Sequence, residues 1–337
     1  MYRSAYDCPS RLSVHSVEQP RCEHAQHHAG RVFSTNIVII QEFLTRPTAK
    51  AAFWPSPNDH VLGGRDLQRP EQGTWLGLTK EGRLACLTNY RESGAQVYGT
   101  KSRGGLPKAF LSLPPNSTQS SQEFARHMVE DVGVSDVGGF SLVFGRLSKR
   151  NIGAKDGEGL AIISNRTEDA SATTWVCGKP GEVQGLSNSH FGDRTWPKVV
   201  EGEKRLESAI KEHVTAGSTK EDLLKSLFDI LSADTLPRRK HGQDWETYVY
   251  QLRNSIFIPR IGGEEVEDAS ADKIATADVG HTAKTDNGVY GTQKQTIILV
   301  DHDGRVTYVE KTLYDENGQP TDNDIQQYEF EIEGWNN

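Results

Sequence analysis

Residues 61–91 constrain the fold of this chain more than any other stretch. They contain two short runs of apolar and small residues, 74–79 and 83–88, which are separated by Lys80-Glu81-Gly82. This pattern predicts a β-hairpin, because glycine readily adopts the positive φ that a tight turn needs. Both runs are nearly continuous in apolar or small residues, so we expect both faces of these strands to be covered.

Polar residues gather at the ends of these two runs. Arg65 and Asp66 precede the first strand, and Asn89 follows the second. Gly63 and Gly64 would let the backbone approach a ligand closely, and scaffolds commonly present a site at such strand ends. On spacing alone, a structural ion pair beside a polar loop is the simpler interpretation.

Several motifs occur in a fixed order along the chain. LGGRD, GTWLG and LTNYR lie within residues 62–91, and GLSN, TWPK and QTIILV follow at 185–188, 195–198 and 295–300. This ordered set resembles the transport and Golgi organization protein 2 family, also called the NRDE family, and indicates a fungal-type member with an atypical N-terminus. The resemblance covers roughly residues 43–330. It implies an α+β, Ntn-hydrolase-like αββα fold, in which two mostly antiparallel sheets are layered between helices.

Composition narrows the class of protein. The chain has 337 residues, a net charge of −8 and four cysteines. A mildly acidic chain has no electrostatic reason to bind nucleic acid, and no apolar run reaches the ~20 residues of a transmembrane helix. The cysteines are too few and too scattered for a disulfide scaffold or a CxxC metal site, so we expect neither a metal nor a bound cofactor. The expected location is cytoplasmic, with Golgi-associated and mitochondrial locations as alternatives.

We expect one family domain over residues 34–333. Residues 1–33 contain four arginines, a group of histidines and little apolar periodicity, which indicates a disordered tail. A transit peptide and a metal site at His24, His27 and His28 are weaker interpretations of the same segment. Residues 262–290 open with an acidic, unpatterned run and are expected to form a flexible insertion.

Patterning predicts the remaining elements. Ser121 is the expected N-cap of the first helix, and Pro197 is expected at the first position of the second. Residues 51–59 should form an extended loop. The cationic stretch 91–107, which contains Lys101 and Arg103 and is followed by Lys108, should form a lid, an anion-binding edge or a solvated connection. The predicted helices are 119–132, 197–213, 221–231 and 245–253; the predicted strands are 36–40, 140–146, 159–165, 296–300, 305–313 and 328–332, with 173–177 and 185–188 in a second sheet.

The N-terminus departs from the family pattern. Members typically begin Met-Cys-Ile and reach Asn-Arg-Asp-Glu-Phe after an apolar strand, whereas this chain has Tyr2 and Ile39-Ile40-Gln41 before Glu42-Phe43-Leu44. Either these groups have been lost, or residues 1–41 are not the genuine N-terminus. The unusual composition of this segment favours the second interpretation.

The resemblance also implies a site. An Ntn hydrolase uses the side chain of its first residue as nucleophile and its α-amino group as base. By similarity to the related choloylglycine-hydrolase group, Asn188 would be the oxyanion donor, and Arg194 is a weaker candidate for a second cation. Asn89 would face the same mouth, although an asparagine after a strand is also an ordinary turn residue.

The nucleophile itself is missing from this pattern. Met1-Tyr2 supplies no suitable group, and Cys8 would serve only if cleavage exposed its amine. Cysteine catalysis by Cys177 or Cys86 with His190 is disfavoured, since neither thiol is predicted beside a helix N-terminus or a basic cluster.

The resemblance implies a role in Golgi organisation and protein secretion, through binding or trafficking of a haem or a lipid or acyl-CoA type of ligand. The expected partner is an amphipathic small molecule, held at a pocket between the sheets by Arg65, Asp66, Asn89, Asn188 and Arg194. One alternative is an Ntn-type amidohydrolase that acts on C–N amide bonds, which this sequence would leave inactive because the N-terminal cysteine is missing. Another is a scaffold without a small ligand. The oligomeric state is left open.

Overall fold

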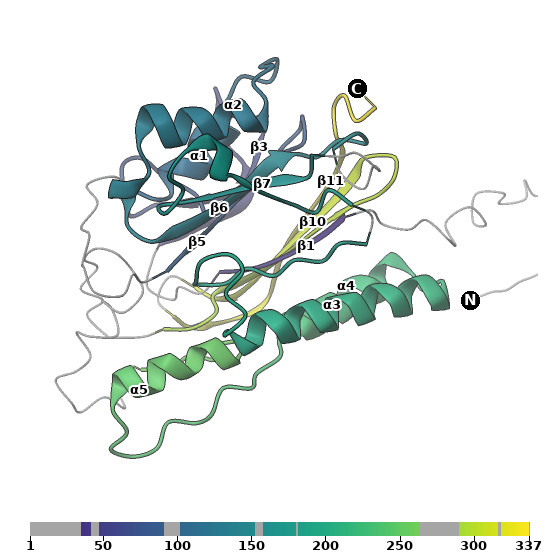
Figure 1. Ribbon diagram of the computed structural model, residues 1–337. Coiled ribbons are helices and arrows are strands. Elements are labelled where there is room, and N and C mark those ends of the chain that lie inside the picture. The colour runs from purple at the N-terminus through teal and green to yellow at the C-terminus, as the bar shows by residue number, and fades with distance from the viewer. Residues whose placement is uncertain are drawn as a thin grey trace, which may run out of the picture.

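The computed structural model describes residues 35–41, 47–90, 102–151, 158–179, 181–262, 290–315 and 318–336 (Figure 1). The predicted tail 1–33, nearly all of the predicted insertion 262–290 and Lys101 lie outside the described residues. None of the described helices is both long enough and apolar enough to cross a bilayer.

Seven strands form the larger sheet, in which each strand pairs antiparallel with its neighbour in the chain. They are β2 (Thr48–Phe53), β3 (Val61–Asp66), β4 (Leu76–Thr79), β5 (Arg83–Asn89), β6 (Phe140–Arg146), β7 (Leu160–Ser164) and β8 (Thr174–Val176). The predicted hairpin is confirmed: Gly82 has a φ of +84°, and its N–H donates to the Thr79 carbonyl at 3.0 Å. Nearly every residue of β4 and β5 is buried, as their apolar runs predicted.

Four strands form the second sheet, in the order β1-β9-β10-β11. Their bounds are β1 (Thr35–Gln41), β9 (Lys294–Val300), β10 (Arg305–Tyr314) and β11 (Pro320–Glu331). All neighbours are antiparallel, and β9 and β10 join through the predicted turn at 301–304, where Gly304 has a φ of +81°. The last strand begins eight residues earlier than the predicted start at 328.

Helices cover the outer faces of both sheets (Figure 1). On the seven-stranded sheet lie α1 (Gly105–Leu111) and α2 (Ser121–Arg126), which continues as a π-helical turn to Val132. Phe110, Phe124 and Phe144 pack edge to face in this outer core, with ring centroids 4.9–5.2 Å apart. On the other side lie α3 (Pro197–Ala216), α4 (Lys220–Leu231) and α5 (Trp245–Val249), which is followed by a 3₁₀ turn (Tyr250–Asn254).

The hydrophobic core between the sheets completes the layer order. Leu62, Leu78 and Leu84 of the larger sheet pack against Ile298 and Tyr308 of the smaller one. The opposite face of β9 packs against the leucines of α4. The layers therefore run helix, sheet, sheet, helix, which confirms the predicted α+β class with antiparallel sheets between helices.

Several local predictions were wrong. The loop predicted at 51–59 begins inside β2. Trp54 is buried in the core under α1 and α2, where its indole N–H donates to the Gly63 carbonyl at 3.0 Å. The predicted strand 185–188 has no strand conformation, and β8 belongs to the larger sheet rather than to a second one. The N-cap of α2 is Ser120, which forms a capping box with Glu123.

The cationic stretch 91–107 also differs from prediction where it is described. Helix α1 occupies its end and buries Leu106 and Phe110 against the larger sheet. Arg103 donates to the Gly139 carbonyl at 2.9 Å, and the Lys108 ammonium bonds to the Glu71 carbonyl. These contacts anchor 103–111 to the scaffold, so a lid over that part is wrong.

Candidate functional site

The inner face of the larger sheet changes character at one end. Thr88 of β5 pairs with Ser141 of β6, which in turn pairs with Ser164 of β7. Directly paired residues share a face of a sheet, and side chains alternate along a strand. These hydroxyls therefore lie on the same inner face as Leu84 and Ile162, which belong to the core between the sheets. We call Thr88, Ser141 and Ser164 the hydroxyl row.

Residues 185–191 lie against the hydroxyl row. The Asn188 amide donates from Nδ2 to the Asn89 carbonyl at 3.0 Å, and the Ser141 hydroxyl donates to the Ser189 carbonyl at 3.5 Å. Phe191 packs against the core between the sheets. Two of the predicted site residues, 99 positions apart in the sequence, are thus in direct contact.

Asn89 contributes to this contact through its backbone. It pairs with Phe140, which belongs to the core under α1 and α2, so the Asn89 side chain lies on the outer face. Its Oδ1 atom is buried without a hydrogen-bond partner among the described residues. The neighbouring Thr88 hydroxyl is the group that lies on the inner face, and the motif LTNYR did not distinguish the two.

Arg194 holds the segment in place rather than lying free at its edge. Its Nη1 atom lies 2.5 Å from Oε2 of Glu203 on α3, and Oε1 of Glu203 accepts from the Gly185 N–H at 2.8 Å. One carboxylate therefore ties both ends of 185–194 to the helix. A role for Arg194 in binding a ligand stays a prediction.

Arg65 and Asp66 each form a hydrogen bond within their own loop. Arg65 donates to Oε1 of Gln72 at 2.7 Å, and Oδ1 of the buried Asp66 accepts from the Gln68 N–H at 2.9 Å. None of these contacts joins the loop to Asn89 or Asn188. A pocket edged by Arg65, Asn89 and Arg194 stays a prediction.

Two other cations lie beside Asn89. Arg103 and the Tyr90 N–H both donate to the Gly139 carbonyl, at 2.9 and 3.1 Å. The Arg166 guanidinium lies 5.6 Å from the centre of the Tyr90 ring. Arg103 lies in the cationic stretch that the sequence singled out. Arg166 carried no such signal, because only the pairing of β5 and β7 with the two sides of β6 brings their ends to the same edge of the sheet.

Neither described thiol is poised for catalysis. Burial raises the pKa of Cys86 to about 12, and burial together with Glu182 raises the pKa of Cys177 to about 11. At pH 7 only about one Cys177 in 10⁴ would be a thiolate, the reactive form. Cysteine catalysis with His190 therefore has no support in these environments.

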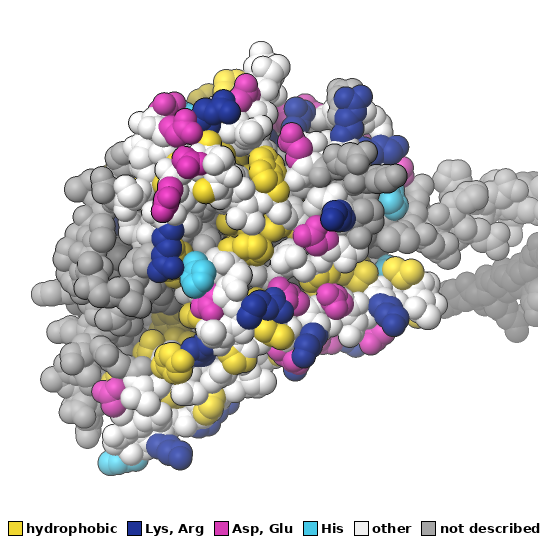
Figure 2. Space-filling model, viewed as in Figure 1, with side chains coloured by type: hydrophobic (Ala, Val, Ile, Leu, Met, Phe, Trp, Pro, Cys, Tyr) yellow, Lys and Arg dark blue, Asp and Glu magenta, His cyan; other side chains and the backbone are white. Residues whose placement is uncertain are grey.

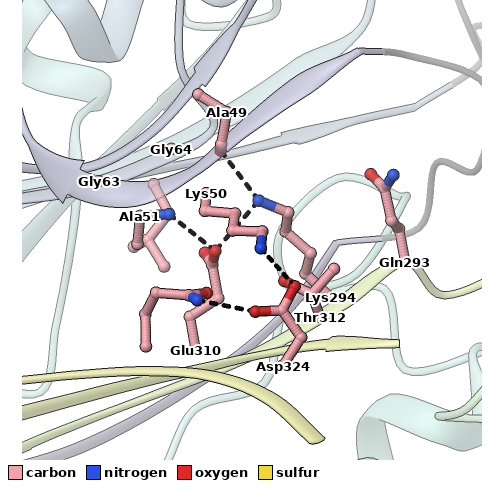
Figure 3. Close-up of polar contacts among 12 residues, drawn as sticks. Ala49, Lys50, Ala51, Gly63, Gly64, Gln293, Lys294, Glu310, Thr312 and Asp324 are labelled. Carbon is pink, nitrogen blue, oxygen red and sulfur yellow. Dashed lines mark hydrogen bonds and ion pairs between the residues drawn. The ribbon is translucent and has the colours of Figure 1, made fainter. Parts of the chain in front are cut away.

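A second polar region lies between the sheets at the edge formed by β2 (Figure 3). The Lys294 ammonium is 3.0 Å from Oε1 of Glu310 and 2.9 Å from the Ala49 carbonyl. Oε1 of Glu310 also accepts from the Ala51 N–H at 2.8 Å. Strand β2 has an irregular register between Ala49 and Ala52, so these side chains satisfy backbone groups that β3 does not pair.

The outer part of this region is more exposed. Lys50 lies 2.7 Å from Asp324, and its side chain is 56% exposed. Lys50, Lys294, Glu310 and Asp324 balance one another in charge, which is typical of a structural clamp. The visible face around α3 and α4 likewise carries both signs of charge interspersed, with apolar side chains gathered above these helices (Figure 2).

Comparison with known proteins places the chain among its relatives. The family profile described as Transport and Golgi organisation 2 matches residues 39–315. A human Transport and Golgi organization protein 2 homolog is 29% identical over 280 residues, covering 82% of this chain and 85% of the relative. An uncharacterized protein of Saccharomyces cerevisiae is 28% identical over 307 residues, covering 85% and 88%.

Among solved structures, a mutant conjugated bile acid hydrolase from Clostridium perfringens matches with 10% identity and a TM-score of 0.29, covering 90% of this chain and 97% of that one. The family assignment comes from the sequence comparisons, which span most of the chain. This protein belongs to the Transport and Golgi organisation 2 family.

Proposed function

We propose that this protein binds an amphipathic small molecule at the hydroxyl row and the Asn188 segment, and that binding or carrying this ligand is its role in Golgi organisation and secretion. The observation that carries the proposal is the contact between the Asn188 amide and the Asn89 carbonyl. It brings a hydrogen-bonding side chain over the one end of the inner face where the apolar residues give way to hydroxyls.

The surroundings favour a ligand with an anionic part and an apolar tail. Arg103 and Arg166 lie beside the end of β5, where they would attract an anion. The partly buried Phe191, which packs on the core between the sheets, places apolar atoms next to the hydroxyls. Acyl-CoA and haem both combine these features, and both fit the expectation drawn from the family resemblance.

A haem ligand would also need an axial group, which is usually histidine, cysteine, methionine or tyrosine. His190 lies two residues from Asn188 and is exposed, so it is the side chain of this segment that would supply an imidazole. His190→Ala should then remove the Soret shift seen on titration with hemin, while leaving palmitoyl-CoA binding unchanged.

Thermal unfolding of the purified full-length chain with palmitoyl-CoA and with hemin tests the proposal. A ligand at 100 times its Kd stabilises the folded state by about 2.7 kcal/mol, so Tm should rise. Asn188→Ala should weaken this shift. Asn151→Ala is the matched control, because Asn151 Nδ2 also donates to a strand carbonyl, that of Arg146, at the opposite end of β6.

The outcomes are distinct. If Asn188→Ala and Asn151→Ala lose similar stability but only the former loses the ligand shift, the site assignment holds. If Asn188→Ala simply fails to fold, the amide is structural and the assignment is wrong. If neither ligand shifts the Tm of the wild-type chain, the proposed binding function is wrong and a scaffold role without a small ligand is favoured.

Amidohydrolase activity is the second candidate. The Asn188 amide has the chemistry of an oxyanion donor, but the described thiols have raised pKa values and would be poor nucleophiles. Mass spectrometry of the native N-terminus decides this question. A mature chain that begins with cysteine supports amidohydrolase activity, and one that begins with Met1 or Tyr2 contradicts it.

A further inference from the structure

The hydroxyl row contains a polar atom that the folded chain leaves unused. Oγ1 of Thr88 is buried and has no hydrogen-bond partner among the described residues. Ser141 is fully buried, and its hydroxyl makes a long bond of 3.5 Å to the Ser189 carbonyl. A buried polar group without a partner is costly, so such a group in a native protein calls for an explanation.

The position of Thr88 suggests what would satisfy it. Two residues earlier on the same face Cys86 is packed in the core, and beyond Thr88 the strand ends at Asn89, where the Asn188 amide is bonded. A larger apolar residue at this position would extend the core without a hydrogen-bonding penalty. The hydroxyl instead lies where the apolar layer ends and the Asn188 segment begins.

The described groups that make up this position are polar but uncharged. The hydroxyl row contributes the side chains of Thr88, Ser141 and Ser164. The segment over it contributes the Asn188 amide and the Ser189 backbone carbonyl. Burying a charged group without a counter-charge costs far more than burying a neutral group that is hydrogen-bonded. The cations Arg103 and Arg166 lie at the strand ends rather than in the row.

We infer that the hydroxyl row binds the uncharged carbonyl of an acyl ester, thioester or amide, with the Thr88 hydroxyl donating to the carbonyl oxygen. This inference rests on the proposed function and narrows it. The anionic part of the ligand stays at the strand ends beside Arg103 and Arg166. A free carboxylate is a poorer occupant of the row than a neutral carbonyl.

Two probes of similar length separate these chemistries. N-Dodecanoylglycine carries an internal amide carbonyl before its carboxylate, whereas tetradecanoate carries only the carboxylate. We expect the wild-type chain to bind N-dodecanoylglycine about tenfold more tightly by isothermal titration calorimetry, a difference of about 1.4 kcal/mol.

Substitution of Thr88 tests the contact directly. Thr88→Val keeps the shape and removes the hydroxyl, so the preference should fall to about twofold or less while Tm stays equal or rises, since an unpartnered group has been removed. Thr88→Ser keeps the hydroxyl and should retain the preference. Thr79→Val is the control: Oγ1 of the buried Thr79 accepts from the Arg83 N–H at 3.1 Å, so Tm should fall and the preference should persist.

The inference and the proposed function fail in different ways. If the wild-type chain binds both probes equally, or if Thr88→Val lowers Tm as Thr79→Val does and leaves the preference intact, Thr88 is structural and the inference is wrong while the binding function stands. If no probe binds at all, including palmitoyl-CoA and hemin, the proposed function itself is wrong.

Discussion

The Lys294 ammonium lies 3.0 Å from the Glu310 carboxylate, and their side chains are only 2% and 3% exposed. Both groups also bond to the backbone of β2, at Ala49 and Ala51. The Tyr328 hydroxyl adds a third bond, to the Ala51 carbonyl at 2.9 Å. Side chains of one sheet thus complete the hydrogen bonding of an irregular edge strand in the other.

Removing one partner of this pair should be severe. Lys294→Met would leave the Glu310 carboxylate buried without its counter-charge, at a cost of about 3–5 kcal/mol in the free energy of unfolding. Lys50→Met is the control, because the Lys50 side chain is 56% exposed where it pairs with Asp324, and this pair should contribute less than about 1 kcal/mol. Urea unfolding measures both values. Equal losses of unfolding free energy would show that the buried pair contributes no more to stability than the exposed one.

Asp324 should make stability depend on acidity. Hydrogen bonds from Lys50 and then from Gln326 hold the pKa of its carboxyl below the ordinary value of 3.8. A lowered folded-state pKa contributes stability above pH 3.8 that is lost as pH falls through the lower value. The stability advantage over Asp324→Asn should therefore be constant near neutrality and shrink below about pH 4. A constant difference down to pH 2 would contradict this assignment.

Two glycines with positive φ should respond differently to alanine. An added Cβ at Gly304 would lie 2.4 Å from Cγ of Trp335, whereas Gly217 has nothing within 4 Å. Gly217→Ala should cost about 1–2 kcal/mol, for the left-handed backbone alone. Gly304→Ala should cost about 1–3 kcal/mol more, because the Trp335 ring must also move. Similar melting temperatures for the two variants would show that the Trp335 ring moves aside at little cost in free energy.

Cys86 should resist alkylation in the folded chain. Burial raises the pKa of its thiol to about 12, so almost no thiolate is present at pH 7.5. Peptide mass spectrometry after brief iodoacetamide treatment should find Cys86 unmodified, and fully modified when the same treatment is given in urea. Rapid modification in the native protein would indicate that β5 opens readily.

Local patterns predicted the elements that depend on local physics. The turn at Gly82, the start of α3 at Pro197 and the leucine face of α4 follow from backbone preference and helical periodicity. Strand β2 and helix α1 were missed because tertiary contacts stabilise them: β2 relies on side chains of the other sheet, and α1 on burial against β4–β6.

For the site too, the sequence indicated which segments are involved, but it did not indicate the contacts that depend on tertiary structure. The family resemblance placed Asn89 and Asn188 at one mouth, and the two residues are in contact, but Asn89 contributes only its backbone carbonyl. The expectation that its side chain faces the same mouth was wrong, because strand register turns that side chain to the outer face. Arg194 was expected at the site but pairs with Glu203, a contact that becomes visible only when α3 turns back over the segment. The Thr88 hydroxyl was missed because strand register decides which of two adjacent polar residues lies on the inner face.

Helix α3 has 20 residues, yet only Lys198 and Val199 are buried. Helix α4, by contrast, buries three leucines, which share a core with Ile297 and Leu299 of β9. Amide hydrogens along the C-terminal turns of α3 should therefore exchange with solvent deuterium well before those of α4 or β9, through openings that leave the sheets intact. Glu203, which binds both ends of residues 185–194, lies near the N-terminus of this helix, so an opening must extend back to Glu203 before it releases the Asn188 segment. Ligand exchange should then be slower than the fraying of the last turns of α3 but faster than unfolding of the whole chain.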